Sequence, residues 1–195
     1  MSKLSELYRE IEACRDCPLA EHRTRVVPGE GPEDAELMFI GEAPGFHEDQ
    51  QGRPFVGPAG HFLEELLSLI GLRRDEVYIC NVVKCRPPGN RDPMPKEVKA
   101  CRKWLERQIE IIDPRVIVTL GRHSMAMFFP GESIGKAHGT ARKVGNRIYF
   151  AMYHPAAALH QQKLRRTIEA DIQKLPSLLA EAEKLQSQPQ QLSMF

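Results

Sequence analysis

The chain has 195 residues, 42% of them hydrophobic and 27% charged, and a formal net charge of +1. These values are those of an ordinary soluble globular protein. No apolar run is long enough to span a bilayer, and the charged N-terminus is unlike a signal peptide, so we expect a cytoplasmic protein. The near-neutral charge does not by itself indicate a nucleic-acid-binding protein.

The first half of the chain predicts two helices and two buried strands. Residues 2–15 carry apolar side chains at helical spacing, with Ser2 as the N-cap. Residues 37–40 form a short apolar run that is typical of a buried strand. Residues 62–70 predict an amphipathic helix ended by a glycine. Residues 77–83 predict a second strand that is again nearly all apolar.

The second half continues this alternation. A long helix is predicted over residues 95–112, and a third strand over residues 116–120. A short helix follows near residues 125–128, and residues 148–152 predict a fourth strand. A final helix is predicted from about residue 163 to residue 184.

Apolar strands alternating with helices indicate an α/β fold. We expect three α/β/α layers around a central, mainly parallel four-stranded sheet, in a single domain over residues 1–184 with a flexible tail over residues 185–195. Ligands of such sheets bind beyond the carboxyl ends of the strands. Those places hold Glu42, Asn81 and His154, with Gly121 after the third strand.

The cysteines predict a metal centre. Cys14 and Cys17 form a C-x-x-C pair, and Cys85 and Cys101 lie far downstream. Four thiolates from two places could enclose zinc or an iron–sulfur cluster, and the alternative is four unrelated thiols. The single C-x-x-C favours a cluster over a zinc ribbon. Cys80 lies inside an apolar strand and is interpreted as a buried core residue.

Basic residues are concentrated in a stretch without Asp or Glu. Residues 133–168 lack acids, and we interpret the stretch as a phosphate-contacting surface, the alternative being ordinary solvated charge. Its cations are Lys136, Arg142, Lys143, Arg147, Lys163, Arg165 and Arg166.

Residues 41–45 and 52–60 are Gly/Pro-rich loops that could bring backbone N–H groups close to a ligand. Phe55 offers either a stacking face for a planar base or a core side chain. Asn81, within an apolar strand, either reads the edge of a base or is satisfied by backbone groups. His154 ends the fourth strand inside the basic stretch.

Taken together, four segments resemble the uracil-DNA glycosylase superfamily, and specifically its iron–sulfur-containing family 4. They are Gly-Glu-Ala-Pro-Gly at residues 41–45, Pro-Phe-Val-Gly at 54–57, Asn-Val-Val-Lys-Cys-Arg-Pro-Pro with Asn-Arg within 81–91, and His-Pro-Ala-Ala-Ala-Leu at 154–159. The resemblance implies a DNA repair enzyme. Such an enzyme flips uracil out of DNA and hydrolyses its N-glycosidic bond, leaving an abasic site.

The resemblance also implies roles for single residues. Phe55 would stack on the uracil, and Asn81 would bind its polar edge, which differs from that of cytosine. Backbone groups of Ala43 and Gly45 would complete the pocket. Ala43 stands where some members have a catalytic Asp or Asn, and Gly45 where others have a Tyr that excludes thymine.

Two side chains are expected to act in the chemistry. His154 would stabilise negative charge on the departing uracil. Glu42 would place or activate water, or offset positive charge on the sugar. Leu159 is a hypothetical wedge that fills the gap left by the flipped base, the alternative being the packing of a helix start.

The family's four cysteines match Cys14, Cys17, Cys85 and Cys101, which implies one structural 4Fe–4S cluster. The expected partner is uracil-containing DNA, single- or double-stranded, bound by a monomer associated with the nucleoid. The tail resembles the peptide by which bacterial repair proteins bind the sliding clamp, the alternative being a frayed terminus. Its anchors are Gln191, Leu192 and Phe195.

Two rival functions use the same cysteines. A non-catalytic nucleic-acid-binding module held by zinc is disfavoured by the polar set at the strand ends. An electron-transfer protein with an exposed cluster leaves the basic stretch unexplained.

Overall fold

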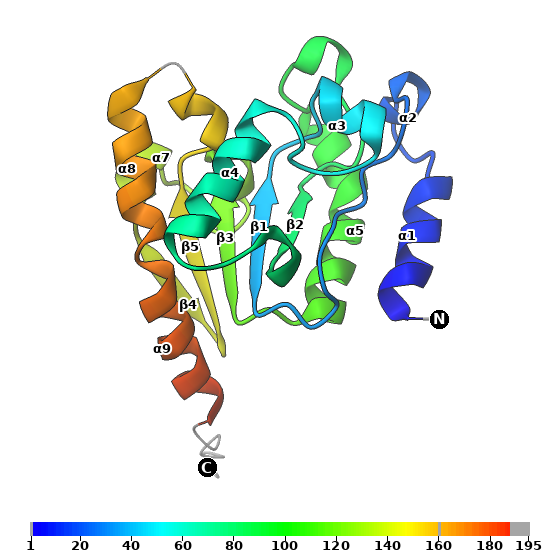
Figure 1. The fold of residues 1–195 in the computed structure, drawn as a ribbon. Helices are drawn as coiled ribbons and strands as arrows, with labels where there is room; N and C mark the ends of the chain where they lie inside the picture. The colour runs from blue at the N-terminus through cyan, green and yellow to red at the C-terminus, as the bar shows by residue number, and fades with distance from the viewer. Residues whose placement is uncertain (1, 160, 188–195) are drawn as a thin grey trace.

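One five-stranded sheet forms the centre of the protein, with strand order β2-β1-β3-β5-β4 (Figure 1). The strands are β1 (Leu37–Gly41), β2 (Tyr78–Asn81), β3 (Val116–Leu120), β4 (Ala141–Val144) and β5 (Arg147–Met152). All neighbouring pairs are parallel except β4 and β5. The computed structural model describes residues 2–159 and 161–187.

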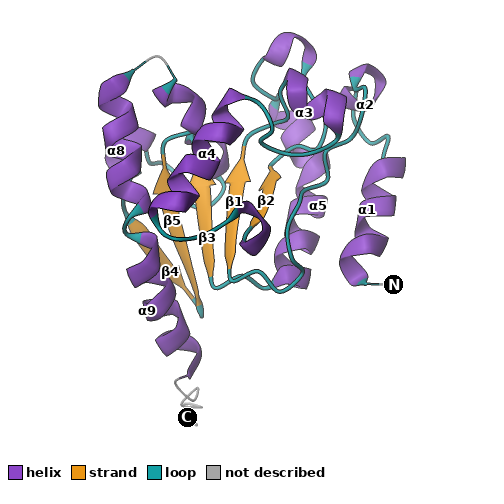
Figure 2. Ribbon diagram, viewed as in Figure 1, coloured by secondary structure: helices purple, strands orange, loops and turns teal. Residues whose placement is uncertain are grey.

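Helices cover both faces of this sheet (Figure 2). The longer ones are α1 (Lys3–Ala13), α4 (Pro58–Leu69), α5 (Pro95–Ile112), α8 (Gln162–Ile172) and α9 (Leu175–Ser187). Short helices that the sequence did not predict are α2 (Leu19–His22), α3 (Phe46–Gln51) and α7 (Ile134–Ala137), and α6 (Arg122–Ala126) is the short helix expected after the third strand.

Side chains of β1 alternate between two cores. Phe39 packs on one face with α4, α8 and α9, whereas Met38 and Ile40 pack on the other face with α1 and α5. Strands buried on both faces read as continuous apolar runs, which explains why β1 is apolar throughout and β3 is apolar except for Thr119. The predicted α/β/α layering is therefore confirmed.

The expected number of four strands was one too few. Strand β4 pairs with β5 through a hairpin whose turn holds Gly145 in a left-handed conformation, with φ of 61°. All four residues of β4 are exposed. A strand at the edge of a sheet needs no buried face, so its polar sequence carries no apolar signal.

The predicted final helix is in fact two helices. Helix α8 ends at Ile172 and α9 begins at Leu175. Pro176 is the physical reason, because its ring would collide with the carbonyl four residues back, at Ile172, if one helix continued. Helix α9 also extends three residues beyond residue 184, into the predicted tail.

The carboxyl ends of the four parallel strands meet at one edge, at the top of Figure 1. Residues predicted to share this edge therefore come together in space. Within residues 2–159 and 161–187, no helix is both long and apolar enough to cross a membrane.

Candidate active site

An open cavity of about 340 Å³ lies at the carboxyl edge of the sheet. Its volume falls in the range of small-molecule binding sites. The six residues expected to contact or act on a base all line it, and they are Glu42, Ala43, Gly45, Phe55, Asn81 and His154.

Asn81 presents an unsatisfied acceptor to this cavity. Its side chain is 2% exposed, and within the described part of the chain its Oδ1 has no hydrogen-bond partner. A Cβ at Gly41 would collide with Asn81 Oδ1 and with the ring of Phe55. Glycine at position 41 thus lets the amide and the aromatic ring approach each other. A buried orphan acceptor indicates a ligand that donates a hydrogen bond.

Phe55 is both a core residue and a cavity wall, so the two sequence interpretations hold together. It is 4% exposed and adopts a left-handed conformation with φ of 51°, which is unusual for a bulky residue. The guanidinium of Arg74 holds this turn by donating to the carbonyl of Phe55 at 2.8 Å. A side chain on Gly60 would collide with the same carbonyl.

The ring of His154 lies 5.5 Å from that of Phe55, inclined by 27°. His154 Nδ1 accepts a hydrogen bond from the Ala156 N–H at 3.1 Å, which leaves Nε2 as the protonated nitrogen of the neutral ring. Burial lowers the pKa of His154 to about 4. A neutral Nε2–H donor therefore persists at neutral pH.

Glu48 organises both cavity loops and was missed from the sequence. Its Oε2 accepts from the Gly45 N–H at 3.1 Å. Its Oε1 accepts from the N–H groups of Val56 and Gly57 at 2.9 and 3.0 Å. The local signal was the capping-box spacing of a Glu three residues after Gly45.

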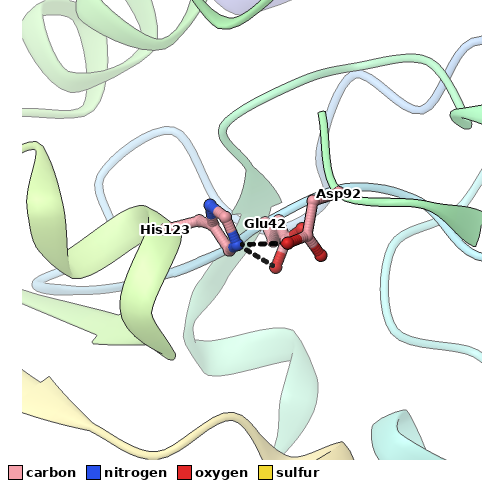
Figure 3. Close-up of side chains that lie close together, drawn as sticks. All are labelled: Glu42, Asp92 and His123. Carbon is pink, nitrogen blue, oxygen red and sulfur yellow. Dashed lines mark ion pairs between the residues drawn. The ribbon is translucent and has the colours of Figure 1, made fainter. Parts of the chain in front are cut away.

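Glu42 lies beside two residues that the sequence did not single out. Figure 3 shows the imidazole of His123 facing two carboxylates. His123 Nε2 is 3.2 Å from Asp92 Oδ2 and 3.7 Å from Glu42 Oε2. Arg122 donates from Nε to the same imidazole nitrogen at 2.9 Å and pairs with Asp92 at 2.5 Å. These residues come from three distant segments, so no local pattern joins them.

The four predicted cysteine ligands line a second, much smaller cavity between α1 and α5. N–H groups donate to three of the sulfurs: Arg23 to Cys85 at 3.0 Å, the Lys84 backbone to Cys101 at 3.3 Å, and Trp104 to Cys14 at 3.4 Å. Donors of this kind stabilise thiolates bound to metal. Cys80 does not line this cavity and packs in the core beside Ile40 and Tyr78.

The spacing of these sulfurs is too wide for zinc. Tetrahedral zinc with Zn–S bonds of about 2.3 Å holds its sulfurs roughly 3.8 Å apart. In the described residues, the only trio of ligand groups within 4.8 Å of one another is Glu42, Asp92 and His123, and no three cysteines meet that limit. The sulfurs as placed therefore do not form a tetrahedral zinc site, and burial raises the pKa of Cys101 to about 12.

The basic stretch is largely paired with acids from other segments. Four of its cations form ion pairs: Arg142 with Glu132, Lys143 with Glu181, Arg147 with Asp113, and Arg165 with Glu65 and Glu169. These cations are partly exposed and such surface pairs are weak, so phosphate contact by this stretch stays a prediction. Leu159 is 40% exposed, just after the short helical turn that follows His154. The anchors of the predicted clamp peptide lie outside the described residues.

Comparison with known proteins identifies the family of the chain. The Uracil DNA glycosylase superfamily matches residues 28–175. Proteins named "Type-4 uracil-DNA glycosylase" are similar over most of the chain. That of Sulfurisphaera tokodaii is 48% identical over 91% of this chain and 86% of its own. Those of Archaeoglobus fulgidus and Thermotoga maritima are 47% and 46% identical, each over 91% of this chain and over 94% and 95% of their own. The chain belongs to the uracil DNA glycosylase superfamily, in its type-4 group.

Proposed function

We propose that this protein is a monofunctional uracil-DNA glycosylase of base excision repair, which hydrolyses the N-glycosidic bond of a flipped uracil. The orphan Oδ1 of Asn81 is the observation that carries the proposal. Uracil has an N–H at ring position 3, whereas cytosine has a bare acceptor there. A buried acceptor with no other partner favours the base that donates, because the wrong base would leave it unsatisfied.

The cavity residues divide the reaction between them. Phe55 provides an apolar face for the base. As the glycosidic bond breaks, negative charge grows on the uracil oxygen, and the Nε2–H of neutral His154 stabilises it. Because the ring is neutral, it donates a hydrogen bond to that oxygen without transferring its N–H proton. Backbone groups of Ala43 and Gly45 line the pocket beside Glu48.

Glu42 acts on the deoxyribose, where positive charge develops, and on the attacking water. Its pKa is raised chiefly by burial, although His123 and Arg122 oppose that effect. In its carboxylate form it offsets positive charge on the deoxyribose and accepts a proton from the attacking water. The proton of water goes to Glu42, the hydroxide forms a bond to the sugar carbon, and the electron pair of the broken bond stays on uracil.

A structural 4Fe–4S cluster is proposed for the cysteine cavity, held by Cys14, Cys17, Cys85 and Cys101. Sulfur spacing too wide for zinc and the donors aimed at the sulfurs support it. When bound, the cluster links the end of α1 to α5 and to the loop after β2. Its role is to hold these segments together.

The remaining proposals concern the DNA. The substrate is uracil-containing DNA in single or double strands, bound by a monomer with residues 1–184 as its domain, in association with the nucleoid.

Exposure of Leu159 supports its role as a wedge. Leu159→Ala should then lose relative rate on duplex DNA, where the base must be unstacked, and unchanged relative rates on duplex and single strands would contradict the wedge.

The proposed clamp contact through Gln191, Leu192 and Phe195 has a separate test. Deleting the last five residues should abolish capture by a bacterial sliding clamp while leaving base release unchanged. Capture that survives the deletion would contradict this contact.

The function itself is tested by base release from oligonucleotides that carry uracil, thymine or cytosine at one position. We expect release of uracil only, and Asn81→Ala should reduce it by about a hundredfold or more. Asn146→Ala, in the exposed turn between β4 and β5, is the control and should keep full activity. DNA binding without release of any base would instead favour a non-catalytic module.

A further inference from the structure

The Glu42 carboxylate is held by residues that no sequence motif joins to it. Asp92 lies in the loop after the turn at residues 88–90, and His123 lies near the start of α6. Both side chains lie beside Glu42 (Figure 3), and the ligand atoms of the three residues all fall within 4.8 Å of one another. Asp92 and Glu42 also line the same cavity. Two carboxylates held this close disfavour each other's ionisation, whereas a protonated imidazole beside them favours it.

Other contacts fix the position of Asp92. Its neighbour Arg91 forms a two-pronged ion pair with Glu97 of α5, with N–O distances of 2.7 and 2.9 Å. Glu97 is 1% exposed and also accepts from the Met94 N–H at 2.7 Å. The loop that carries Asp92 is therefore anchored in a buried charged contact.

His123 Nε2 can take two roles. When it is neutral, this nitrogen accepts from Arg122 Nε. When it is protonated, it donates to Asp92 at 3.2 Å and faces Glu42 as a cation. In the protonated form its charge therefore acts on both carboxylates at once.

We propose that Asp92 and His123 are positioning residues of the glycosylase reaction, which fix the Glu42 carboxylate at the cavity mouth and set the pH range in which it serves. This inference rests on the proposed function of Glu42. In this proposal both residues act through Glu42. Their charges oppose each other there, since the cation favours the carboxylate and the second carboxyl group disfavours it.

The other titratable and charged groups around the cavity have partners or charge states of their own. Both oxygens of Glu48 accept backbone N–H groups. Arg91 pairs with Glu97. His154 is neutral above about pH 4. Arg122 adds to the positive side of the Glu42 environment. The acidic limb of the pH–rate profile should therefore respond chiefly to the trio.

The test uses the full-length holoprotein and measures kcat/KM for a uracil oligonucleotide against pH. His123→Gln removes the cation and should move the midpoint of the acidic limb upward by about half a pH unit or more. Asp92→Asn removes the competing carboxyl charge and should move it downward by a similar amount. A purely structural role would change rates without shifting the midpoint in opposite directions.

Matched controls show whether the two shifts of the acidic limb come from the cavity or from a change in overall charge. His22→Gln on α2 and Asp75→Asn, both exposed, remove the same charges far from the cavity and should leave the limb unmoved. Carbon-13 NMR titration of the Glu42 carboxyl measures the same displacement without turnover, and should show it even in a variant of low activity. The inference is overturned if the acidic limb stays in place in His123→Gln and Asp92→Asn, or shifts in the same direction in both. The proposed function is judged separately, by whether the wild-type protein releases uracil.

Discussion

At the scale of single residues, His154 links catalysis to stability. Its folded-state pKa of about 4 lies below the ordinary value of 6.5, because burial disfavours the charged ring. The unfolded chain therefore takes up a proton between pH 6.5 and 4, and the folded protein does not. Stability is complete above pH 6.5 and falls as the pH drops toward 4.

The size of this loss is on the order of 2 kcal/mol in free energy of unfolding. His154→Gln should remove this part of the pH dependence and flatten the difference between urea denaturation curves at pH 7 and pH 4.5. If the wild type and the variant lose the same stability between pH 7 and pH 4.5, the ring of His154 is not held neutral in the folded protein.

Gly60 is a second residue whose role is steric. A methyl group at this position would collide with the carbonyl of Phe55. Gly60→Ala should therefore displace the Phe55 turn, with a loss of about 2 kcal/mol or more in stability, as is usual for overpacking against backbone. Thermal denaturation measures the loss. Gly135→Ala is the matched control, because its φ is not positive either and a Cβ there would meet only Tyr153 Oη at 3.7 Å.

At the scale of elements, α3 joins two loops that lie far apart in sequence. Glu48 accepts three N–H groups, one from its own loop and two from the loop that leads into α4. Glu48→Ala leaves these donors without their charged acceptor. We expect it to cost about 2 kcal/mol in unfolding free energy and to reduce uracil release more than it weakens DNA binding. Glu21→Ala on α2 is the exposed control.

At the scale of the whole molecule, the cysteine cavity connects the N-terminal segment to the domain. Helix α1 packs on α5, and its last turn leads directly into Cys14. Cys17→Ala should lower the melting temperature and remove the visible absorbance expected of an iron–sulfur centre, because the loss of a metal ligand removes folding free energy. Cys80→Ala, in the core, should cost about 1 kcal/mol and leave the absorbance intact.

Chelation of iron provides the same test without mutation. If the cluster is structural, its removal should lower the melting temperature by several degrees. Unchanged thermal stability after complete loss of iron would contradict a structural role.

Most of the central sheet could be predicted because buried parallel strands carry a continuous apolar signal, as in β1 and β3. The motif residues Glu42, Asn81 and His154 also followed from the rule that places ligands at the carboxyl ends of such strands. Edge strand β4 had no such signal. The break between α8 and α9 was present in the sequence as Pro176.

The sequence by itself determined the family, the layers of the fold, and the side chains and cysteines that carry the motifs. Only the tertiary structure decided which distant groups meet: Asp92 and His123 at Glu42, and Glu48 at two loops. It also decided that the four sulfurs stand too far apart for zinc, and that most of the basic stretch is paired. Periodicity and motifs report local preferences, whereas these contacts arise where separate loops converge and leave no periodic trace in the chain.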